Sequence, residues 1–467
     1  MESQHALKYL PEFVSKMAQE NLHPSVIDAF SYYYKQVVSG ETGFVFDKDI
    51  IPVTHDEITH FIHLQKYADA GRRILKKSVR IILNGGLGTS MGLSGPKSLL
   101  EVKKNRSFLH ILVKQAERQR AKLAIMNSFS THGPTLAALS HIKSNISPLI
   151  FHQNKFPKVL RHGFAPANCP ENHALEWNPP GHGDIFTSLY ISGTLQKLLD
   201  ENIEYAFISN SDNLGATLDE SLLGYFSENN LSFMMEVAEK TPSDLKGGHL
   251  ARQKDGRLIL RESSQCPDDE LDAFQNINRY KFFNTNNIWV HLPSLHDQIK
   301  KESCLRLPLI LNPKTLDPNN EKSDPVYQVE TAMGAAISLF ENSQAVNVPR
   351  SRFFPVKKCN ALLAVRSDCY VLSKNEKLTI HPDRISANLT DTINIKLDPR
   401  FYRSINLFEE RFKEGVPSLF KCESLTVEGN VFLEKNVTIK GNTRITKSGT
   451  AKGKIEQGSV LEGEIIL

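Results

Sequence analysis

A glycine-rich loop that directly follows an apolar run is the feature that most constrains how this chain folds. The loop spans residues 83–97, reads LNGGLGTSMGLSGPK and contains five glycines. The run before it, which includes Val79, Ile81 and Ile82, has the character of a buried strand. Because glycine lets the main chain approach a ligand closely, successive N–H groups of such a loop can point at a phosphate oxygen or a base edge. The pattern predicts a strand followed by a nucleotide-binding turn.

This loop does not match either of two familiar phosphate-binding motifs. It lacks the GxxxxGK[ST] spacing of the Walker loop, and GGLG is not the GxGxxG fingerprint of dinucleotide-binding domains. Lys97 ends the loop after Pro96 and would supply the positive charge that a polyphosphate needs. The loop therefore favours a nucleotide site, but it argues against a generic kinase or dehydrogenase.

Composition narrows the class of protein. A chain of 467 residues has room for about three domains, and 40% hydrophobic with 23% charged residues is typical of a globular protein. The formal net charge of +4 is too small to indicate a broad nucleic-acid or membrane surface. No apolar run approaches the roughly 20 residues of a membrane span, and the first residues, MESQHALKYL, form no secretory core. We therefore expect a cytoplasmic protein that binds neither nucleic acid nor membrane.

The six cysteines fit that compartment. They are scattered along the chain without CxxC spacing, which argues against a zinc site and against a disulfide framework. We interpret them as reduced thiols.

Three regions follow one another along the chain. Residues 1–77 carry apolar residues at helical spacing and are predicted to be a helical N-terminal region, with a further helix starting at 54–57. From 78 to 372, short β-rich runs alternate with helical stretches, which predicts a parallel sheet covered by helices on both faces. Ligands of such sheets bind outside the carboxyl ends of the strands, so the loops that follow the strands should converge. The expected strands are 79–84, 123–128, 148–153, 204–212, 231–240, 257–263 and 281–290, and the expected helices are 107–122 and 135–142.

A six-residue period marks the C-terminal region, 373–467. Leu425, Val431, Val437 and Thr443 fall in one phase, and a second apolar phase runs two residues behind it. A hexapeptide repeat is typical of a parallel β-helix, in which each rung buries its apolar position against the next. The open end of such a coil is an exposed edge, so we expect either self-association through it or a capped monomer.

Six ordered blocks of sequence resemble one family. They are LNGGLGTSMG with GPKS (83–98), PPGHGDIFTSLY (179–190), SNSDNLGAT (209–217), KFFNTNNIWV (281–290), ETAMGAA (330–336) and VPRSRFFPVK (348–357). Together they resemble the signature of the UTP–glucose-1-phosphate uridylyltransferases, the UDP-glucose pyrophosphorylases of eukaryotic type. The likeness runs from about residue 78 to the C-terminus. One departure is Leu93-Ser94, where the family pattern has Cys-Lys.

The resemblance implies both a fold and a reaction. The fold is an α/β, Rossmann-like nucleotidyltransferase domain (GT-A-like) at 78–372, with a C-terminal parallel left-handed β-helix. In the reaction, an oxygen of glucose 1-phosphate attacks the α-phosphorus of UTP in line and reversibly, so that UDP-glucose forms and pyrophosphate leaves. Such chemistry depends on positioning and on charge neutralisation, and no covalent intermediate is required. The cofactor implied is Mg2+.

The same resemblance assigns roles to individual residues. Lys97, Lys357 and Asp212 are implied as catalytic, with Asp212 also holding Mg2+, a metal that needs only one or two carboxylates beside phosphate oxygens. The nucleotide-binding set implied is Leu83, Gly85, Gly86, Leu87, Gly88, Thr89, Met126, Gln153 and Gly181. The set implied for the sugar phosphate is His182, Asn210, Asn284, Asn286 and Glu330.

Side-chain chemistry agrees with several of these roles, although each has a structural alternative. The amide of Gln153 offers the donor and the acceptor that a uracil edge requires, and amides at 284 and 286 can match sugar hydroxyls. Asp212 could equally be a turn or helix-cap aspartate, and Met126 a core residue. Glu330 is expected to open a helix, where an acidic residue also has a structural motive.

Other functions stay open at this point. A UDP-sugar pyrophosphorylase of broader specificity would differ by only a few hydrogen bonds to the sugar. A nucleotide-sugar-binding scaffold without catalysis is a second alternative, which the presence of Lys97, Asp212 and Lys357 disfavours. An acyltransferase is disfavoured because the hexapeptide region is short and contains no histidine.

Overall fold

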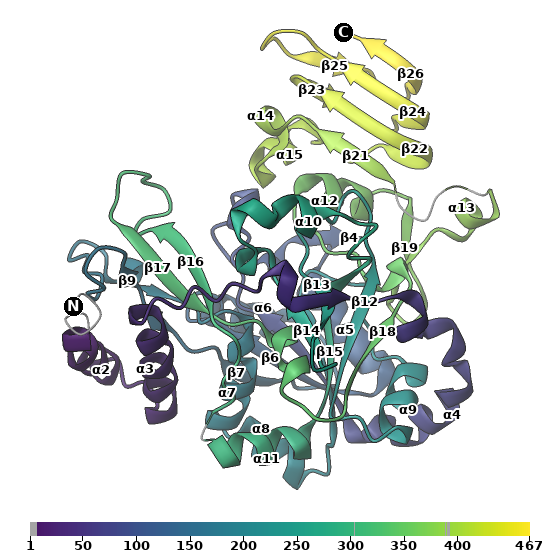
Figure 1. The fold of residues 1–467 in the computed structure, drawn as a ribbon. Coiled ribbons are helices and arrows are strands. Elements are labelled where there is room, and N and C mark those ends of the chain that lie inside the picture. The colour runs from purple at the N-terminus through teal and green to yellow at the C-terminus, as the bar shows by residue number, and fades with distance from the viewer. Residues whose placement is uncertain (1–6, 303, 388, 390–392) are drawn as a thin grey trace.

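The computed structural model describes residues 7–302, 304–387, 389 and 393–467. Within this part of the chain, an 11-stranded sheet forms the centre (Figure 1). Its main path runs through β2 (Thr59–His60), β18 (Ser343–Asn347), β12 (Phe233–Glu239), β15 (Phe282–His291), β11 (Tyr205–Asn210), β3 (Ser78–Asn84), β6 (Lys122–Asn127) and β7 (Leu149–His152). The strands β1 (Ile50–Pro52), β13 (His249–Gln253) and β14 (Leu258–Arg261) join it at the side.

The sheet is mixed, so the prediction of a parallel sheet is corrected. The strands β11, β3, β6 and β7 are parallel neighbours, and β12 is parallel to β18. In contrast, β15 runs antiparallel to both β11 and β12. Its chain returns from β12 through the hairpin of β13 and β14, and such a return needs no crossover helix. The alternation of apolar runs located this strand but could not reveal its direction.

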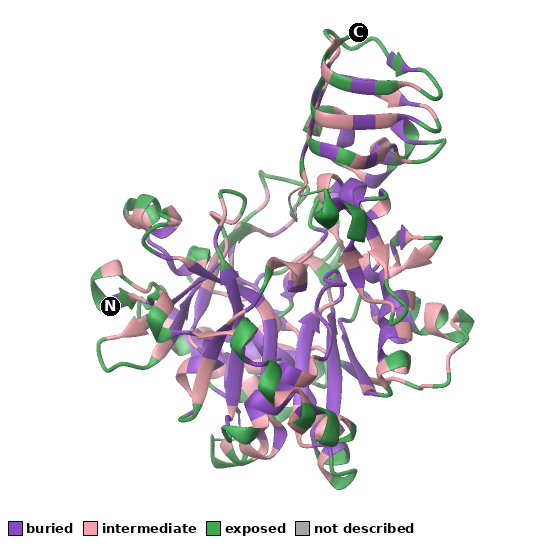
Figure 2. Ribbon diagram, turned by 90° about the vertical axis from the view of Figure 1, so that its right-hand side faces the viewer, coloured by how far each residue is buried: buried purple, intermediate pink, exposed green. Residues whose placement is uncertain are grey.

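Helices cover both faces of the sheet, as predicted. In β3, the side chain of Ile82 belongs to the apolar cluster of α5 (Phe108–Gln119), whereas Ile81 and Leu83 belong to that of α7 (Ile185–Ile191) and α8 (Thr194–Asp200). This division follows from the two-residue period of a strand, whose neighbouring side chains point to opposite faces. All seven residues of β3 are buried, and Figure 2 shows the central strands as the buried interior of the molecule.

The remaining helices of the central region complete these layers. They are α6 (His132–His141), α9 (Glu220–Glu228), α10 (Leu271–Gln275), α11 (Leu292–Glu302) and α12 (Cys359–Arg366). A three-stranded sheet of β16 (Ile310–Thr315), β17 (Pro325–Glu330) and β9 (Val159–Leu160) lies beside the main one.

The N-terminal region is less uniformly helical than predicted. Its helices α2 (Leu10–Gln19) and α3 (Pro24–Val38) share an apolar cluster with Phe156 and Trp177, so they pack against the segment that follows β7. Beyond them, β1 and β2 join the central sheet, and α4 (Ala68–Ile74) packs on α9. The expected helix at 54–57 is a single 3-10 turn, His55–Glu57, closed by a capping box between Thr54 and Glu57.

The C-terminal region coils in parallel rungs. One ladder contains β21 (Asn394–Leu397), β22 (Ser418–Glu428), β24 (Thr438–Thr446) and β26 (Val460–Ile466), and a second contains β23 (Val431–Leu433) and β25 (Gly453–Ile455). Leu425 pairs with Thr443 in neighbouring rungs, so positions of the predicted hexapeptide phase do stack on one another. The parallel coil is thus observed, while its left-handedness stays a prediction.

The boundary expected between 372 and 373 falls inside a hairpin. The strand β19 (Tyr370–Leu372) pairs antiparallel with β20 (Leu378–Ile380). Moreover, Leu425 and Val431 of the coil belong to the same apolar cluster as Ile82 of the central sheet. The coil is therefore packed onto the central region through a continuous core.

No helix in the described ranges is both long and apolar enough to cross a membrane. The cytoplasmic location stays a prediction.

Candidate active site

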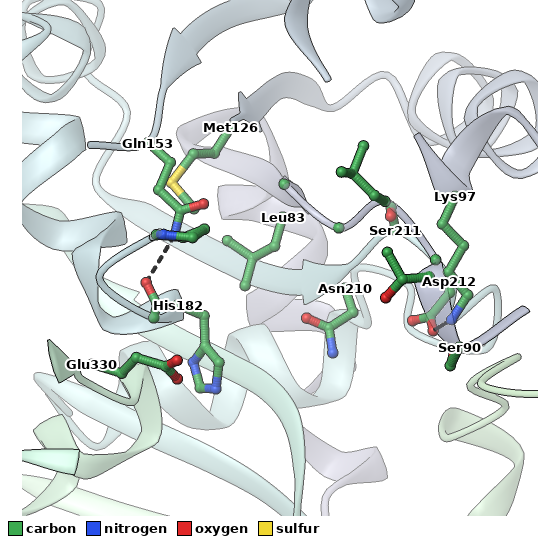
Figure 3. Close-up of a pocket in the computed structure, with 17 residues that line it drawn as sticks. Leu83, Ser90, Lys97, Met126, Gln153, His182, Asn210, Ser211, Asp212 and Glu330 are labelled. Atoms are coloured by element: carbon green, nitrogen blue, oxygen red, sulfur yellow. Dashed lines mark hydrogen bonds and ion pairs between the residues drawn. The ribbon is translucent and has the colours of Figure 1, made fainter. Parts of the chain in front are cut away.

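A cavity of about 480 Å³ opens where the loops after β3, β6, β7 and β11 converge. Its walls include most of the site residues expected from the sequence: Leu83, Gly85, Gly86, Leu87, Gly88, Thr89, Lys97, Met126, Gln153, Gly181, His182, Asn210, Asp212 and Glu330. Figure 3 shows Lys97 and Asp212 at one end of the cavity and Gln153 with Met126 at the other. The expected convergence of the loops is therefore present.

Three lining residues were not expected. Pro179, Ser90 and Ser211 also line the cavity. Each lies within one of the six sequence blocks that resemble the family. The blocks therefore contain more of the cavity wall than the individual residues to which the resemblance assigns a role.

The glycine loop needs glycine at specific positions. Gly88 has a φ of 66°, and a Cβ atom there would lie 2.7 Å from Cδ1 of Leu93. A Cβ at Gly85 would lie 2.7 Å from Oε1 of Gln153, so this position allows the loop to approach the segment after β7. The N–H of Lys97 donates to the carbonyl of Gly86 at 3.1 Å, which closes the loop and fixes the lysine backbone.

At one end of the cavity, Lys97 and Asp212 form an ion pair. Nζ of Lys97 lies 2.6 Å from Oδ2 of Asp212, and their side chains are only 13% and 12% exposed. Lys97 begins the 3-10 helix η8 (Lys97–Leu99), and Asp212 follows β11. Because β3 and β11 are parallel neighbours, the loops after both strands open at the same edge.

At the other end, hydrogen bonds orient the amide of Gln153. Its Nε2 donates to the carbonyl of Gly181 at 2.8 Å, and its backbone N–H donates to Asn127 at 2.7 Å. The amide oxygen is consequently available to a ligand. Met126 is 1% exposed and lines this end of the cavity beside Gln153.

A buried carboxylate holds the chain next to Gln153. Asp184 accepts from the N–H of Asn154 at 2.7 Å and from the hydroxyl of Ser188 at 2.8 Å. Burial raises the pKa of Asp184, and the hydrogen bonds from Asn154 and Ser188 oppose that rise.

His182 is held as a neutral imidazole with one defined donor. Its Nδ1 accepts from the N–H of Met333 at 3.0 Å, so the proton of the neutral ring is on Nε2. Burial, aided by the positive charge of Lys357, lowers the pKa of His182 to about 4. The residue can therefore donate a hydrogen bond to an anionic oxygen without itself becoming charged near neutral pH.

Glu330 lines the cavity from a different element than expected. It is the last residue of β17, and the 3-10 helix η13 begins only at Met333 (Met333–Ser338), so the prediction that Glu330 opens a helix is wrong. β17 pairs with β16 up to Glu330, and the backbone is still extended at Ala332, with φ −111° and ψ 130°. Burial raises the pKa of the carboxyl, which also accepts from the amide of Asn312 at 3.3 Å.

Three expected residues do not line this cavity. Asn284 and Asn286 lie in β15, where the amide of Asn284 donates to that of Asn286 at 2.8 Å. Asn286 has a φ of 57°, next to an irregularity in the pairing with β12, so both amides are fixed by the strand itself.

Lys357 is the third of these residues, and it is exposed. Among the described residues, no acidic group lies within ion-pair distance of its ammonium. Its charge nevertheless lowers the pKa of His182 and opposes the raised pKa of the partly buried Glu262, so it faces the same region.

A buried ion pair connects the segments of Asp212 and Lys357. Arg352 donates from Nε to Glu236 at 2.8 Å and from Nη2 at 2.6 Å, and its carbonyl accepts from the amide of Asn213 at 3.1 Å. The amide oxygen of Asn213 accepts from the N–H of Phe354 at 2.9 Å. This network fixes the main chain directly after Asp212 to the segment that ends at Lys357, and no local sequence pattern indicated it.

The protein supplies only part of a metal site, here called the half-site: one carboxylate, which ligand oxygens and water would have to complete. Across the residues that the structure describes, no three His, Cys, Asp or Glu side chains gather to hold a metal ion. Asp212 is the carboxylate beside the glycine loop. One carboxylate completed by ligand phosphates and water is the coordination that Mg2+ accepts.

Comparisons with known proteins agree with this geometry. The model of the family described as UTP--glucose-1-phosphate uridylyltransferase matches residues 27–440. The chain is 37% identical over 470 residues to the UTP--glucose-1-phosphate uridylyltransferase of Encephalitozoon cuniculi, covering 98% of this chain and 91% of that protein. It is 41% identical over 369 residues to that of Solanum tuberosum, covering 77% and 75%.

The solved structures give the same picture. A UDP-glucose pyrophosphorylase from Leishmania major, solved in open and closed structures, superposes with a TM-score of 0.91 at 39% identity and covers 98% of this chain and 99% of that one. The UDP-glucose phosphorylase from Trypanosoma brucei superposes with a TM-score of 0.88 at 41% identity, covering 98% and 100%.

Proposed function

The chain belongs to the UTP–glucose-1-phosphate uridylyltransferase family, and we propose that it converts UTP and glucose 1-phosphate to UDP-glucose and pyrophosphate. The observation that carries the proposal is the single cavity that brings together the glycine loop, Lys97, Asp212, Gln153 and His182 from separate segments. A phosphate cradle, a base-reading amide and a neutral donor in one cavity suit a nucleotide and a sugar phosphate.

The uridine would bind at the Gln153 end. The hydrogen bond from its Nε2 to Gly181 leaves the amide oxygen free to accept from the uracil N–H. Met126 and Leu83 would pack on the base, and the N–H groups of residues 85–89 would point at the phosphates.

The reacting phosphates would lie at the Lys97 end. We assign Lys97 to the triphosphate and Lys357 to the opposite side of the transferring phosphoryl group, because two polyanions must meet while charge grows on the leaving oxygen. His182 would donate from Nε2 to the phosphate of glucose 1-phosphate. These groups position the two substrates and neutralise the charge of their phosphates. The step would therefore be a direct in-line displacement without a covalent intermediate.

The sugar would be held by acceptors and amides. Glu330 and Asn210 line the cavity, and Asn284 and Asn286 lie in β15 beyond it. Amides fixed by their own strand can match a set of hydroxyl groups without further loss of side-chain freedom.

The donor set at Asp212 fits Mg2+. Asp212 would hold the ion together with phosphate oxygens of UTP, as the half-site described above requires. When bound, Mg2+ would neutralise the triphosphate and orient its oxygens.

The direct test is release of pyrophosphate. We expect the purified protein to release it from UTP and glucose 1-phosphate when Mg2+ is present, and not when chelator replaces Mg2+. Galactose 1-phosphate should be a much poorer substrate, since hydroxyl-matching amides discriminate epimers. Equal turnover of both sugars would replace this proposal with the broad-specificity UDP-sugar pyrophosphorylase. Tight UDP-glucose binding without turnover would favour the non-catalytic scaffold.

Two finer structural assignments accompany this function. The order β11, β3, β6 and β7 of parallel strands, with the nucleotide loop after β3, supports a Rossmann-like, GT-A-like catalytic domain. The 18-residue offset between Leu425 and its partner Thr443 supports a β-helix with three hexapeptides in each coil, which we assign as left-handed.

The outer rung offers a surface for self-association. On β26, Val460 is 60% exposed and Ile466 is 82% exposed. We propose a homo-oligomer that forms through this edge. Sedimentation of the full chain should show an assembly that Ile466→Lys weakens, whereas a monomer at all concentrations would mean that the edge is self-protecting.

A further inference from the structure

The ion pair between Lys97 and Asp212 lies inside the cavity, not beside it. Both residues line its wall, and the ammonium lies 2.6 Å from Oδ2 of the carboxylate. Both side chains are largely withdrawn from solvent, at 13% and 12% exposure. A charge pair in such surroundings is screened less than a surface pair.

This pair uses the carboxylate on which the proposed metal site depends. Glu330, the other acidic residue in the cavity wall, comes from β17 and accepts a hydrogen bond from Asn312. In the described part of the chain, no cluster of three potential metal ligands could bind the ion without Asp212. A divalent ion on Asp212 would lie against the ammonium of Lys97, and the two cations repel each other.

We propose that Lys97 is a placeholder that keeps the metal site on Asp212 closed until a nucleoside triphosphate takes over its ammonium. This inference rests on the proposed function of the same cavity. When the triphosphate enters, its oxygens attract the ammonium of Lys97 away from Asp212. The freed carboxylate, together with those phosphate oxygens, then completes the half-site for the metal ion.

The surrounding structure allows this exchange with side-chain movement alone. The backbone N–H of Lys97 is held by Gly86 at 3.1 Å, and the carbonyl of Asp212 accepts from the N–H of Val356 at 3.3 Å. The lysine has a flexible four-carbon stem that ends in a strongly hydrated point charge, so its head can move between two anionic partners while its backbone stays in place.

Binding of Mn2+ to the nucleotide-free protein tests the proposal. Free Mn2+ is measured by electron paramagnetic resonance in titrations of the parent protein, Lys97→Met, Lys97→Arg and the double variant Lys97→Met/Asp212→Asn. We expect Lys97→Met to bind Mn2+ at least about tenfold more tightly than the parent, because the carboxylate is released. Lys97→Arg keeps the cation and should bind as weakly as the parent, and the double variant should lose the gain.

Equal Mn2+ affinity in the parent and Lys97→Met would overturn the proposal. So would a gain in Lys97→Met that survives Asp212→Asn, because the ion would then be bound elsewhere. Circular dichroism of each variant confirms that it is folded, and Lys97→Gln replaces Lys97→Met if the latter is not.

A second measurement uses the parent protein and separates this inference from the proposed function. The rate at which acetic anhydride acetylates Lys97 is followed by peptide mass spectrometry. Mg2+ alone at millimolar concentration should leave that rate unchanged, and UTP should lower it. A rate that rises with Mg2+ alone would show that the metal displaces Lys97 unaided and would overturn the placeholder role, even if pyrophosphate release supports the proposed function. Absence of pyrophosphate release with unchanged Mn2+ results would instead refute the function and leave the placeholder standing for another triphosphate.

Discussion

The two lysines assigned to the proposed reaction occupy opposite surroundings. Lys97 lies in the cavity wall, 13% exposed, with its ammonium on Asp212. Lys357 is exposed, lies outside the cavity wall and has no acidic group at ion-pair distance among the described residues. One side of the site is therefore assembled before any ligand arrives, whereas the other is anchored only through its backbone.

That anchor is the buried pair of Arg352 and Glu236. Arg352 lies five residues before Lys357 and is 1% exposed, so a single short segment is rigid at one end and free at the other. The difference indicates that the ammonium of Lys97 is held on Asp212 in the cavity wall until a ligand arrives, while Lys357 contributes an exposed charge that can follow its ligand. Four predictions test this contrast.

The largest effect is expected from removing the anchor. Arg352→Met leaves the carboxylate of Glu236 buried without its charged partner, so the free energy of unfolding should fall by about 3–5 kcal/mol. Urea denaturation measures it. The matched control is Arg350→Met, whose partner Asp244 lies at 2.9 Å in a partly exposed pair and whose loss should cost less than about 1 kcal/mol. Equal losses in the two variants would mean that Arg352 is not the anchor.

Lys97→Met should cost the most activity. The ammonium of Lys97 at the reacting phosphates is expected to contribute about 10²–10³-fold to kcat. Steady-state pyrophosphate release measures kcat and KM, and the loss should appear mainly in kcat. Lys97→Arg is the control that retains the charge with a different shape. A change confined to KM would place Lys97 in ground-state binding only.

Lys357→Met should have a smaller effect that depends on salt. Because its ammonium is exposed, its contribution to kcat/KM, about 10-fold to 10²-fold at low salt, should shrink as ionic strength rises toward 1 M. The difference between parent and variant is measured across that range. Lys358→Met, the exposed neighbour, should leave activity within about twofold of the parent. A salt-independent difference at Lys357 would show that it works from a desolvated position like that of Lys97.

The smallest effect is expected in the acid stability of the protein. The pKa of His182 is lowered to about 4 in the folded state from an ordinary value near 6.5, so the unfolded state binds more protons between these values. Stability should therefore fall as pH drops from 6.5 toward 4, by at most about 1.4 kcal/mol for each pH unit and for this one group.

Lys357 should influence this titration, because its charge contributes to the lowered pKa of His182. In Lys357→Met the pKa of His182, followed by nuclear magnetic resonance, should rise toward 6.5 and the loss of stability should become shallower. If the pKa of His182 did not change in Lys357→Met, Lys357 would lie too far from His182 to act on the ligand of the cavity.

The sequence predicted the parts of this molecule that depend on local chemistry. The strand and loop around Gly86, the turn at Gly181 and the hexapeptide phase at Leu425 are each marked by neighbouring residues, and each lies where expected. The features that the sequence could not predict depend on pairing between segments that are far apart in the chain. The antiparallel course of β15, the extended backbone at Glu330 and the partnership of residues 236 and 352 join segments far apart in the chain, and no local spacing encodes them.

The apolar cluster that runs from Ile82 of β3 to Leu425 and Val431 of the C-terminal coil has a consequence for cooperativity. Because the strand that carries the glycine loop and the innermost rungs share one continuous apolar cluster, which also contains residues of α5 and α12, loss of packing in one should weaken the packing of the other. Calorimetry should accordingly record a single melting endotherm for the central sheet and the coil. A substitution that loosens the packing of a distant rung should lower the affinity of the cavity for the nucleotide.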